Sequence, residues 1–440
     1  MRSKSDKKKP LVPSLRFPEF REAGAWEVKR LGELSEIVRG GSPRPITDYI
    51  TTDSEGLNWL KIGDVHQNEK YVTSTEEKVK KSAISKTREV YPGDLIMSNS
   101  MSFGRPYILK IKTCIHDGWI AVTDINNEVE RDYLYYFILS SSSQFYFRNA
   151  AAGGGVKNLN ADIVKLLSVS LPHYLEQQKI AHCLSSLDEV IGLQAKKVQA
   201  LKQHKKGLMQ QLFPAEGETT PRLRFPEFRE AGAWGVKRLG EIYRFKPTNS
   251  WSRDQLNYDS GTIKNIHYGD IHKELNRTFR IDDEVVPYVN DTLADSVKED
   301  AFCEEGDIVL ADASEDVDDI GKAIEIVDIG GQRLVSGLHT ILASRIDHRI
   351  VVGFGAYLYA SSGVRKQIQQ RAQGAKVLGI SKTQLAEVEL AYPTEAREQQ
   401  KIAHCLSSLD DVIGLESHKL DALKNLKKGL MQQLFPQDVA

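Results

Sequence analysis

Two long segments of the chain carry apolar residues in alternating steps of four and three. We call the sixteen apolar residues of this pattern, eight in each segment, the seam. A repeat of about 3.5 residues keeps one stripe of a helix facing a partner helix. The pattern predicts two long helices, over residues 173–213 and 395–436, and each segment closes with a Phe-Pro pair that ends a helix. The seam consists of Ile180, Leu184, Leu187, Ile191, Val198, Leu201, Leu208 and Leu212 in the first segment, and Ile402, Leu406, Leu409, Ile413, Leu420, Leu423, Leu430 and Leu434 in the second.

Four polar residues fill the remaining positions of the two stripes: Gln194 and Lys205, then Glu416 and Lys427. Polar residues at such positions set the register of a helix pair at some cost in stability. The stripe in each helix spans roughly 33 residues, which corresponds to about 50 Å of helix. The simplest arrangement is an antiparallel pair formed by the two helices. The alternative is that each helix packs on the globular segment that precedes it.

The chain also repeats itself at two places. Residues 14–34 and 222–242 are identical at 18 of 21 positions, and the stretch "LRFPEFREAGAW" is the same in both. Residues 175–214 and 397–436 are identical at 31 of 40 positions. The offsets, near 210 residues, are far longer than the period of a solenoid repeat. The sequence therefore predicts a duplicated domain, with a recent duplication that has no functional content as the alternative.

The inserts between these blocks, roughly 35–172 and 243–394, are only faintly alike. "KIGDVH" at 61–66 is echoed by "HYGDIH" at 267–272. We expect both inserts to share a fold and to differ on the surface. The identical blocks would then be scaffold, with the aromatic residues Phe17, Phe20, Phe225 and Phe228 packed against a helix or a partner.

Composition narrows the class of protein. A chain of 440 residues is long enough for two or three domains. No apolar run reaches the roughly 18 residues of a membrane helix, and residues 1–13 are expected to form a basic, disordered tail. The four cysteines, Cys114, Cys183, Cys303 and Cys405, fit a reducing cytoplasm and suggest neither disulfides nor a metal site. The net charge of −1 gives no indication of nucleic-acid binding.

Several motifs in order carry a family resemblance. "WEVKRLGEL" runs into "VRGGSPRP", and "GGGVKNLNADIVKLLSVSLP" runs into "EQQKIAHCLSSLDEVIG". The second half repeats the pattern with "GAKVLGISKTQLAEVELAYP" and "EQQKIAHCLSSLDDVIG". Their order, spacing and duplication resemble the specificity subunit of type I restriction-modification systems, and the likeness covers almost the whole chain.

The resemblance implies an α+β fold with two globular target-recognition domains, separated by two long antiparallel coiled-coil helices, in a pseudo-two-fold internal repeat. The domains would span residues 14–172 and 222–394, with a linker at 214–221. Each domain would read one half of a split, asymmetric site in double-stranded DNA, and the helices would fix the unread gap. Two copies of the modification subunit would dock on the repeated blocks, and a restriction and motor subunit would join them.

The resemblance also implies that this bacterial or archaeal cytoplasmic chain takes no cofactor itself, since S-adenosylmethionine would sit on the modification subunits. The sequence has no (N/D)PP(Y/F) tetrapeptide, no glycine-rich S-adenosylmethionine loop and no P-loop, so we expect no catalytic residue and no metal site. These missing motifs disfavour a fused nuclease or methylase. A coiled-coil adaptor with two diverged protein-binding heads remains the alternative.

Candidate DNA contacts come from polar loops of the inserts. The first insert has 16 basic and 16 acidic residues and the second 17 and 24, so phosphate neutralisation must come from local clusters or from partners. Arginine can form two hydrogen bonds with guanine, and asparagine can form two with adenine. Each loop could equally be a solvated turn without a DNA contact. The candidates are Arg39, Ser42, Arg44, Lys61, His66, Asn99, Ser100, Arg105, Lys157 and Asn158 in the first insert, and Lys246, Asn249, Trp251, Arg253, Lys264, His267, Lys322 and Lys376 in the second.

Overall fold

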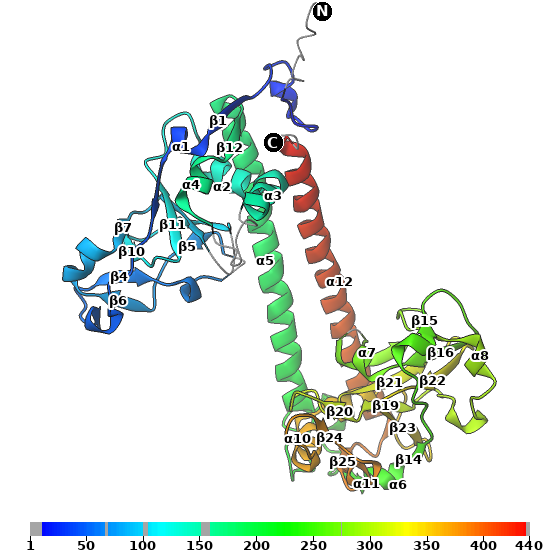
Figure 1. Ribbon diagram of the computed structural model, residues 1–440. Coiled ribbons are helices and arrows are strands. Elements are labelled where there is room, and N and C mark those ends of the chain that lie inside the picture. Colours follow the sequence, from blue (N-terminus) through cyan, green and yellow to red (C-terminus); the bar gives the residue numbers. More distant parts are fainter. Residues whose placement is uncertain (1–10, 67–68, 100–103, 151–158, 274, 437–440) are drawn as a thin grey trace, which may run out of the picture. The chain divides into compact units, whose positions relative to one another are not determined.

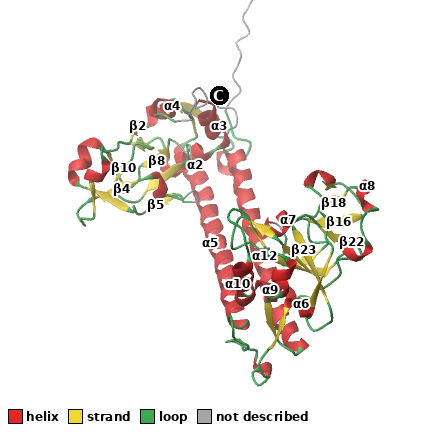
Figure 2. Cartoon of the chain, turned by 60° about the horizontal axis from the view of Figure 1, so that its bottom comes forward, coloured by secondary structure: helices red, strands yellow, loops and turns green. Residues whose placement is uncertain are grey.

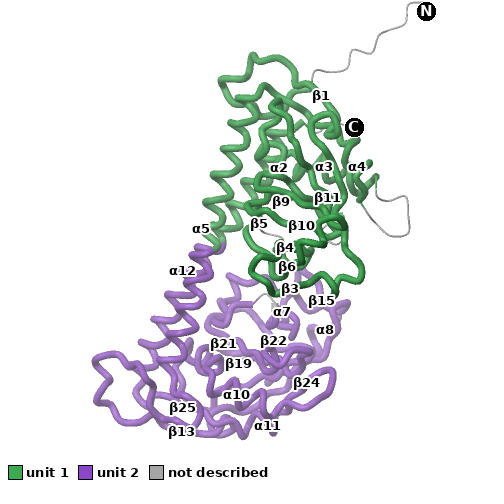
Figure 3. The backbone as a smooth tube through the Cα atoms, turned by 90° about the vertical axis from the view of Figure 1, so that its left-hand side faces the viewer, with its two compact units in different colours: residues 1–195, 418–440 green, residues 196–417 purple. Residues whose placement is uncertain are grey.

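The computed structural model describes residues 11–66, 69–99, 104–150, 159–273 and 275–436 (Figure 1). The chain divides into two compact units (Figure 3). The first unit contains residues 1–195 and 418–440, and the second contains residues 196–417. Each unit therefore holds one insert together with part of each long helix.

The two predicted helices are α5 (Tyr174–Leu212) and α12 (Ala396–Leu434), of 39 residues each. They run antiparallel within each unit. In the first unit Lys427 near the end of α12 donates to Asp188 near the start of α5, at 2.5 Å. In the second unit Lys205 near the end of α5 pairs with Asp410 near the start of α12. The predicted antiparallel pairing is confirmed.

The first insert forms two five-stranded sheets, with strand orders β2-β11-β8-β9-β5 and β3-β6-β4-β10-β7, beside a β1-β12 ribbon. Helix α2 contacts β9 on one side and α5 on the other (Figure 2). The elements are β1 (Glu27–Arg30), α1 (Leu31–Leu34), β2 (Glu36–Arg39), β3 (Ile50–Thr51), β4 (Leu57–Leu60), β5 (Tyr71–Val72), β6 (Glu77–Val79), β7 (Arg88–Val90), β8 (Leu95–Ser98), β9 (Pro106–Leu109), β10 (Thr113–Ile115), β11 (Trp119–Thr123), α2 (Arg131–Leu139), α3 (Ser141–Ala150), α4 (Ala161–Lys165) and β12 (Ser168–Leu171).

The second insert repeats this architecture. Its sheet β14-β23-β19-β21-β17 matches the first sheet strand for strand, and a β15-β18-β16-β22 sheet, a β13-β25 ribbon and a β20-β24 pair complete it. The elements are β13 (Gly235–Arg238), α6 (Leu239–Ile242), β14 (Tyr243–Lys246), β15 (Leu256–Asn257), β16 (Ile263–Ile266), α7 (Tyr268–Lys273), β17 (Thr278–Arg280), β18 (Tyr288–Val289), α8 (Asp291–Ala294), β19 (Ile308–Ala311), β20 (Ala313–Ser314), β21 (Ala323–Asp328), β22 (Arg333–Ser336), β23 (Thr340–Arg345), α9 (Gly355–Ala360), α10 (Ser362–Arg371), β24 (Leu378–Gly379), α11 (Lys382–Ala386) and β25 (Glu389–Tyr392).

The inserts share an unusual feature in the sheets β2-β11-β8-β9-β5 and β14-β23-β19-β21-β17. One edge strand of each sheet is parallel to its neighbour. Strand β5 pairs in parallel with β9, and β17 pairs in parallel with β21. A parallel pair also joins β4 to β10 and β16 to β22. The same strand order and the same parallel pairs show that the inserts share a fold although their sequences have diverged.

The seam residues are all buried or half-buried, but they do two different jobs. Residues at the helix ends, such as Ile180 and Leu434, belong to the core of the first domain. Leu212 and Ile402 belong likewise to the core of the second domain. Further along the helices, Leu187 and Ile191 are half-buried and Val198 is buried, and none of the three belongs to a domain core. The two arrangements considered from the sequence, helix against helix and helix against domain, therefore occur together.

Each helix ends at its Phe-Pro pair, and the phenylalanine enters the domain of the other half of the sequence. Phe213, after α5, stacks at 5.7 Å on Phe354 of the second domain. Phe435, after α12, lies 5.6 Å from Tyr133 of the first domain. Both phenylalanines are almost fully buried, so each domain core is completed by the end of the helix that follows the other domain.

The repeated "LRFPEFREAGAW" stretch holds the start of one helix. Arg16 donates from Nε and Nη2 to the two carboxylate oxygens of Glu176 in α5, both at 2.7 Å. Arg224 binds Glu398 of α12 in the same way, at 2.7 and 2.6 Å. Since these pairs are mostly buried, the geometry of a two-pronged ion pair fixes the segment on the helix.

The same stretch also reaches the end of the other helix. The Leu15 amide donates to the Gln433 carbonyl of α12 at 3.0 Å. The Leu223 amide donates to the Gln211 carbonyl of α5 at 2.9 Å. The predicted scaffold role is consistent with the aromatic residues, since Phe17 lies under the Lys179 ammonium at the start of α5. Phe225 lies in the same way under Lys401 of α12.

Candidate nucleic-acid interface

Four predicted DNA contacts of the first domain converge on one turn, residues 116–118, between β10 and β11. Asp117 is at its centre. The Ser42 hydroxyl donates to Asp117 Oδ1 at 2.8 Å, and the Arg39 Nε donates to the Asp117 carbonyl at 3.0 Å. Asn99 Nδ2 donates to the same carbonyl at 2.9 Å. Arg44 Nη2 lies 3.6 Å from Asp117 Oδ2 and is largely exposed.

The local sequence explains why these loops meet. The amides of Gly40 and Gly41 donate to the carbonyls of Trp119 and Ile115, which continues the pairing of β2 with β11 beyond the strand. A Cβ atom at Gly40 would collide with the His116 carbonyl oxygen. Glycine at this position therefore lets the "RGGSPRP" loop lie directly on the turn.

The charge of Asp117 is stabilised at this turn. Burial alone would raise its pKa, but the hydrogen bond from Ser42 and the charges of His116, Arg39 and Arg44 outweigh burial and lower the pKa. Arg39 and Arg44 are both exposed, so the turn presents two cationic, fork-shaped donors beside one anionic acceptor. Arginine of this kind can bond guanine or phosphate, and a carboxylate can accept from the cytosine amino group.

The remaining described candidates of the first domain lie outside this group. Lys61 is half-buried and pairs with Glu77 at 2.9 Å. His66 is exposed. Arg105 lies over the Tyr107 ring at 5.8 Å, and its Nε is buried without a hydrogen-bond partner. Three further candidates, Ser100, Lys157 and Asn158, lie outside the described residues.

The second domain has a matching turn, residues 337–339, between β22 and β23, with different chemistry. The Asn249 amide donates to the Ser336 carbonyl at 2.9 Å, in the place where Gly41 bonds Ile115. His339 Nδ1 lies 3.3 Å from Asp312 Oδ1, and Asp312 occupies the position of Asn99 in the first domain. The Tyr268 ring packs against His339 with centroids 5.3 Å apart.

A histidine and an arginine extend this second cluster. His267 is buried against Tyr268, and its pKa is lowered by burial and by the nearby Arg253, so the ring is neutral at pH 7. The Gly269 amide donates to His267 Nδ1 at 3.2 Å, which leaves the proton on Nε2. Arg253 pairs with Asp270. Unlike the neutral His267 ring, its guanidinium is always charged. The first turn thus offers two exposed arginines that lie beside Asp117. The second offers imidazole and phenol groups, and its one arginine, Arg253, is paired with Asp270.

Other candidates of the second domain have structural roles. Lys246 is buried, and its ammonium bonds Glu304 at 2.8 Å and the Phe302 carbonyl at 3.1 Å, so in this conformation it faces the protein interior and not a ligand. Trp251 packs on the β15-β18-β16-β22 sheet. Lys264 lies over the Tyr288 ring. Lys322 donates to the His272 carbonyl at 2.6 Å, whereas Lys376 is exposed.

Sequence reasoning missed five residues that the structure places at the turns: His116 and Asp117 in the first domain, and Tyr268, Asp312 and His339 in the second. Tyr268 lies inside "HYGDIH", whereas Asp312 and His339 are distant from that motif in the sequence and meet Tyr268 only in the folded domain. His339 adopts a left-handed backbone conformation with φ of 55°, which residues other than glycine rarely do. Such local strain is common at functional sites, and it marks this turn.

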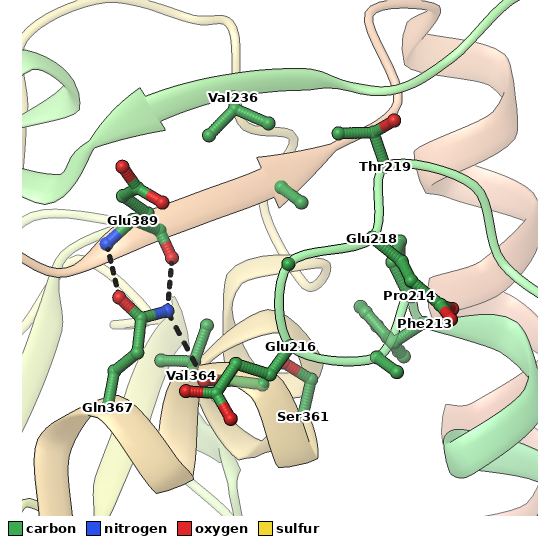
Figure 4. A pocket seen from close by; sticks show the side chains of 14 residues that line it. Phe213, Pro214, Glu216, Glu218, Thr219, Val236, Ser361, Val364, Gln367 and Glu389 are labelled. Atoms are coloured by element: carbon green, nitrogen blue, oxygen red, sulfur yellow. Dashed lines mark hydrogen bonds between the residues drawn. The ribbon is translucent and has the colours of Figure 1, made fainter. Parts of the chain in front are cut away.

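A pocket lies away from both turns. It is a cavity of about 130 Å³ in the second unit, between the linker after α5 and helix α10 (Figure 4). Gln367 crosses its wall and exchanges two hydrogen bonds of 2.9 Å with the backbone of Glu389. No candidate DNA contact lines it. Among the described residues there is no cluster of His, Cys, Asp and Glu that could hold a metal, and no helix long and apolar enough to cross a membrane.

Comparison with known proteins gives a consistent picture. Residues 24–203 and 232–425 each match the family described as "Type I restriction modification DNA specificity domain". The MjaVIII specificity subunit of a type I restriction enzyme from Methanocaldococcus jannaschii is 23% identical over 447 residues, covering 96% of this chain and 93% of that protein.

Two solved structures are similar in fold. The S subunit of a type I restriction-modification system from M. genitalium has a TM-score of 0.57 at 14% identity, covering 97% of this chain and 99% of that one. A chain from a structure of complex assembly and conformational transition in the type I R-M system has a TM-score of 0.55 at 16% identity, covering 94% of this chain and 98% of that one.

Proposed function

The chain belongs to the family of type I restriction-modification DNA specificity domains and is the specificity subunit of such a system. We propose that each of its two target-recognition domains reads one half of a split, asymmetric DNA site. The observation that carries the proposal is the contrast between the two turns. The same strand order presents Arg39, Arg44 and Asp117 in one domain and Tyr268 and His339 in the other. One scaffold with two sets of donors and acceptors suits two different half-sites.

An exchange of domains tests this reading. We expect that replacing residues 35–172 by the insert of another specificity subunit changes one half of the recognised sequence and leaves the other half and the gap unchanged. The measurement is methylome sequencing after co-expression with the modification subunit. The matched experiment replaces residues 243–394 and should change the other half. A change in both halves after either exchange would contradict two independent readers.

We further propose that two copies of the modification subunit dock on this chain. Support comes from large apolar side chains that are exposed and repeated. Leu193 of α5 is 68% exposed and its equivalent on α12, Leu415, is 71% exposed. Val190 and Val412, one turn earlier on the same helix faces, are also exposed. Exposed apolar groups duplicated in both units fit one partner surface that binds twice.

Single substitutions on this repeated surface should remove one partner copy at a time. Leu193→Asp and Leu415→Asp each place a charge in the proposed interface, and we expect complexes with one modification subunit where the unmodified chain binds two. Native mass spectrometry of the co-expressed complex counts the copies. Val285→Asp is the control, because Val285 is 76% exposed and belongs to a diverged insert. Two bound copies in both leucine variants would contradict the proposed surface.

The same division of labour follows for chemistry. We infer that methyl transfer, S-adenosylmethionine and DNA cleavage belong to partner subunits, and that this chain supplies only recognition and assembly. The support is the sequence, which lacks the methyltransferase and P-loop motifs, together with the descriptions of the family and its relatives, which name specificity and no catalysis.

A further inference from the structure

Each unit contains a bridge of one tyrosine, one aspartate and one lysine, which we call the Tyr–Asp–Lys bridge. In the first unit Tyr136 of α2 donates to Asp188 Oδ2 of α5 at 2.7 Å. Lys427 of α12 donates to the other oxygen, Asp188 Oδ1, at 2.5 Å. One carboxylate thus joins the recognition domain to both long helices.

The second unit builds the same bridge from the exchanged helices. Tyr357 of α9 donates to Asp410 Oδ2 of α12 at 2.9 Å. Lys205 of α5 pairs with the same carboxylate. The lysine also lies over the tyrosine ring in both units, with Nζ 5.2 Å from the Tyr357 centroid and 5.3 Å from the Tyr136 centroid. Both tyrosine side chains are fully buried.

The bridge lies where diverged sequence meets repeated sequence. Asp188 and Asp410 are equivalent positions of the repeated helices, as are Lys205 and Lys427. The tyrosines come from the inserts, which otherwise differ. A buried, charge-assisted hydrogen bond is directional, whereas the apolar contacts around it tolerate sliding. The bridge therefore defines the angle at which each domain meets its own helices.

The first unit adds a second tie at the same place. Lys70, just before β5, donates to Ser185 of α5 at 2.9 Å and pairs with Asp132 of α2 at 2.6 Å. Its ammonium lies 4.6 Å from the Tyr136 centroid. The contacts hold α2 to the helix from two directions, so this domain has more polar ties to α5 than the tyrosine alone provides.

We propose that Asp188 and Asp410 are positioning residues that make the subunit strict about the length of the unread gap. This inference rests on the proposed function, in which two domains read two half-sites. Moving a half-site by one base pair shifts it by about 3.4 Å and turns it by roughly 35° around the DNA axis. A domain locked at one angle on its helices cannot follow that movement. A domain without the bridge keeps its polar contacts at the start of the helix but loses the one that joins it to both helices, so it can follow the movement further.

The test uses the full complex with the modification subunit and a series of DNA duplexes that share both half-sites and differ by one base pair in the gap. Tyr136→Phe and Tyr357→Phe remove the hydroxyl and keep the buried ring, and Asp188→Asn and Asp410→Asn remove the charge. We expect each variant to raise methylation of the neighbouring gap lengths relative to the preferred one by about tenfold, the value of one such hydrogen bond. Preference between half-site sequences should stay unchanged.

Lys206→Ala is the control, because Lys206 is an exposed lysine of α5 outside the bridge, and it should keep the gap preference. Thermal unfolding shows whether each variant is folded. If Asp188→Asn or Asp410→Asn does not fold, the gap preference of Tyr136→Phe and Tyr357→Phe tests the inference. Variants that keep the strict gap of the unmodified protein would overturn the inference alone. An unmodified protein that methylates no split site would overturn the proposed function as well.

Discussion

Arg16 and Glu176 show at the scale of single residues why twelve residues are spelled twice. The ion pair is buried and two-pronged, and its copy is Arg224 with Glu398. A buried carboxylate can be matched by few other arrangements, so both the arginine and its partner must recur wherever the scaffold recurs. Identity of the repeated stretch is thus a consequence of packing and does not require a repeated active site.

Removal of one partner from this pair should be costly. Glu176→Gln leaves the Arg16 guanidinium buried with a neutral partner, and we expect a loss of about 3 kcal/mol in the free energy of unfolding. Lys179→Ala is the matched control, because Lys179 pairs with Glu19 at the surface and its loss should cost less than about 1 kcal/mol. Denaturant unfolding measures both, and equal effects would contradict the argument from burial.

Glu325 makes the second unit sensitive to pH. Burial raises its pKa from 4.5 to about 7, although the amides of Gly353 and Ala356 donate to its carboxylate. The folded state therefore holds this proton more tightly than the unfolded state does. The stabilisation is fully present below pH 4.5 and is lost as the pH rises through about 7.

Glu325→Gln should remove that dependence. The unmodified protein is expected to lose stability between about pH 5 and pH 8, by up to about 3 kcal/mol from this group, and the variant should show a flatter profile over the same range. The thermal unfolding midpoint, recorded at several pH values, is the measurement. A variant with the same slope as the unmodified protein would show that other groups set the pH dependence.

Single candidate contacts were only partly predictable. The loop of Arg39, Ser42 and Arg44 stood out because arginines and a hydroxyl share a glycine-rich turn. Asp117 did not, because its importance comes from three loops that meet only in the folded domain. Lys246 is a different case, because a lysine near a predicted loop looked available. In the structure its ammonium bonds Glu304 and the Phe302 carbonyl, and its contact with DNA stays a prediction.

At the scale of elements, the helices were the most predictable part of the fold. A 3.5-residue repeat needs no knowledge of the partner, so the helices could be inferred directly. Their antiparallel pairing was the simplest arrangement and the one that the family resemblance implies. The repeat could not show which surface buries each residue. Leu187 and Leu434 occupy equivalent-looking seam positions, yet Leu434 enters a domain core and Leu187 stays half-buried outside it.

Lengthening both helices tests their proposed role in setting the gap. Seven residues inserted after Ala195 and seven inserted after Ser417, at matched places of the pair, preserve the seam and add about 10.5 Å. We expect the unread gap to grow by about three base pairs, with both half-sites unchanged. Methylome sequencing reads the new motif. An unchanged gap would mean that the helices do not measure it.

At the scale of the whole molecule, the duplication and the shared fold of the inserts followed from the sequence, but the division into units did not. The sequence suggests one half up to the linker at 214–221 and another after it. The compact units instead assign residues 418–440 to the first domain and 196–212 to the second. The reason is Phe213 and Phe435, whose apolar character predicts burial without indicating which core receives them.

The hydrogen bonds from Leu15 to Gln433 and from Leu223 to Gln211 have a topological consequence. In the second unit the end of one helix and the start of the next repeat are joined by the covalent linker as well as by this bond. In the first unit the same two elements meet without that linker, through this bond, a second one from the Ser14 hydroxyl to the Gln433 carbonyl, and apolar packing. The start of each repeat is therefore held at the end of a long helix, with or without a covalent linker between them. A permuted chain that opens at the linker, with a short loop joining residue 436 to residue 14, should therefore keep the hydrogen bonds of both units.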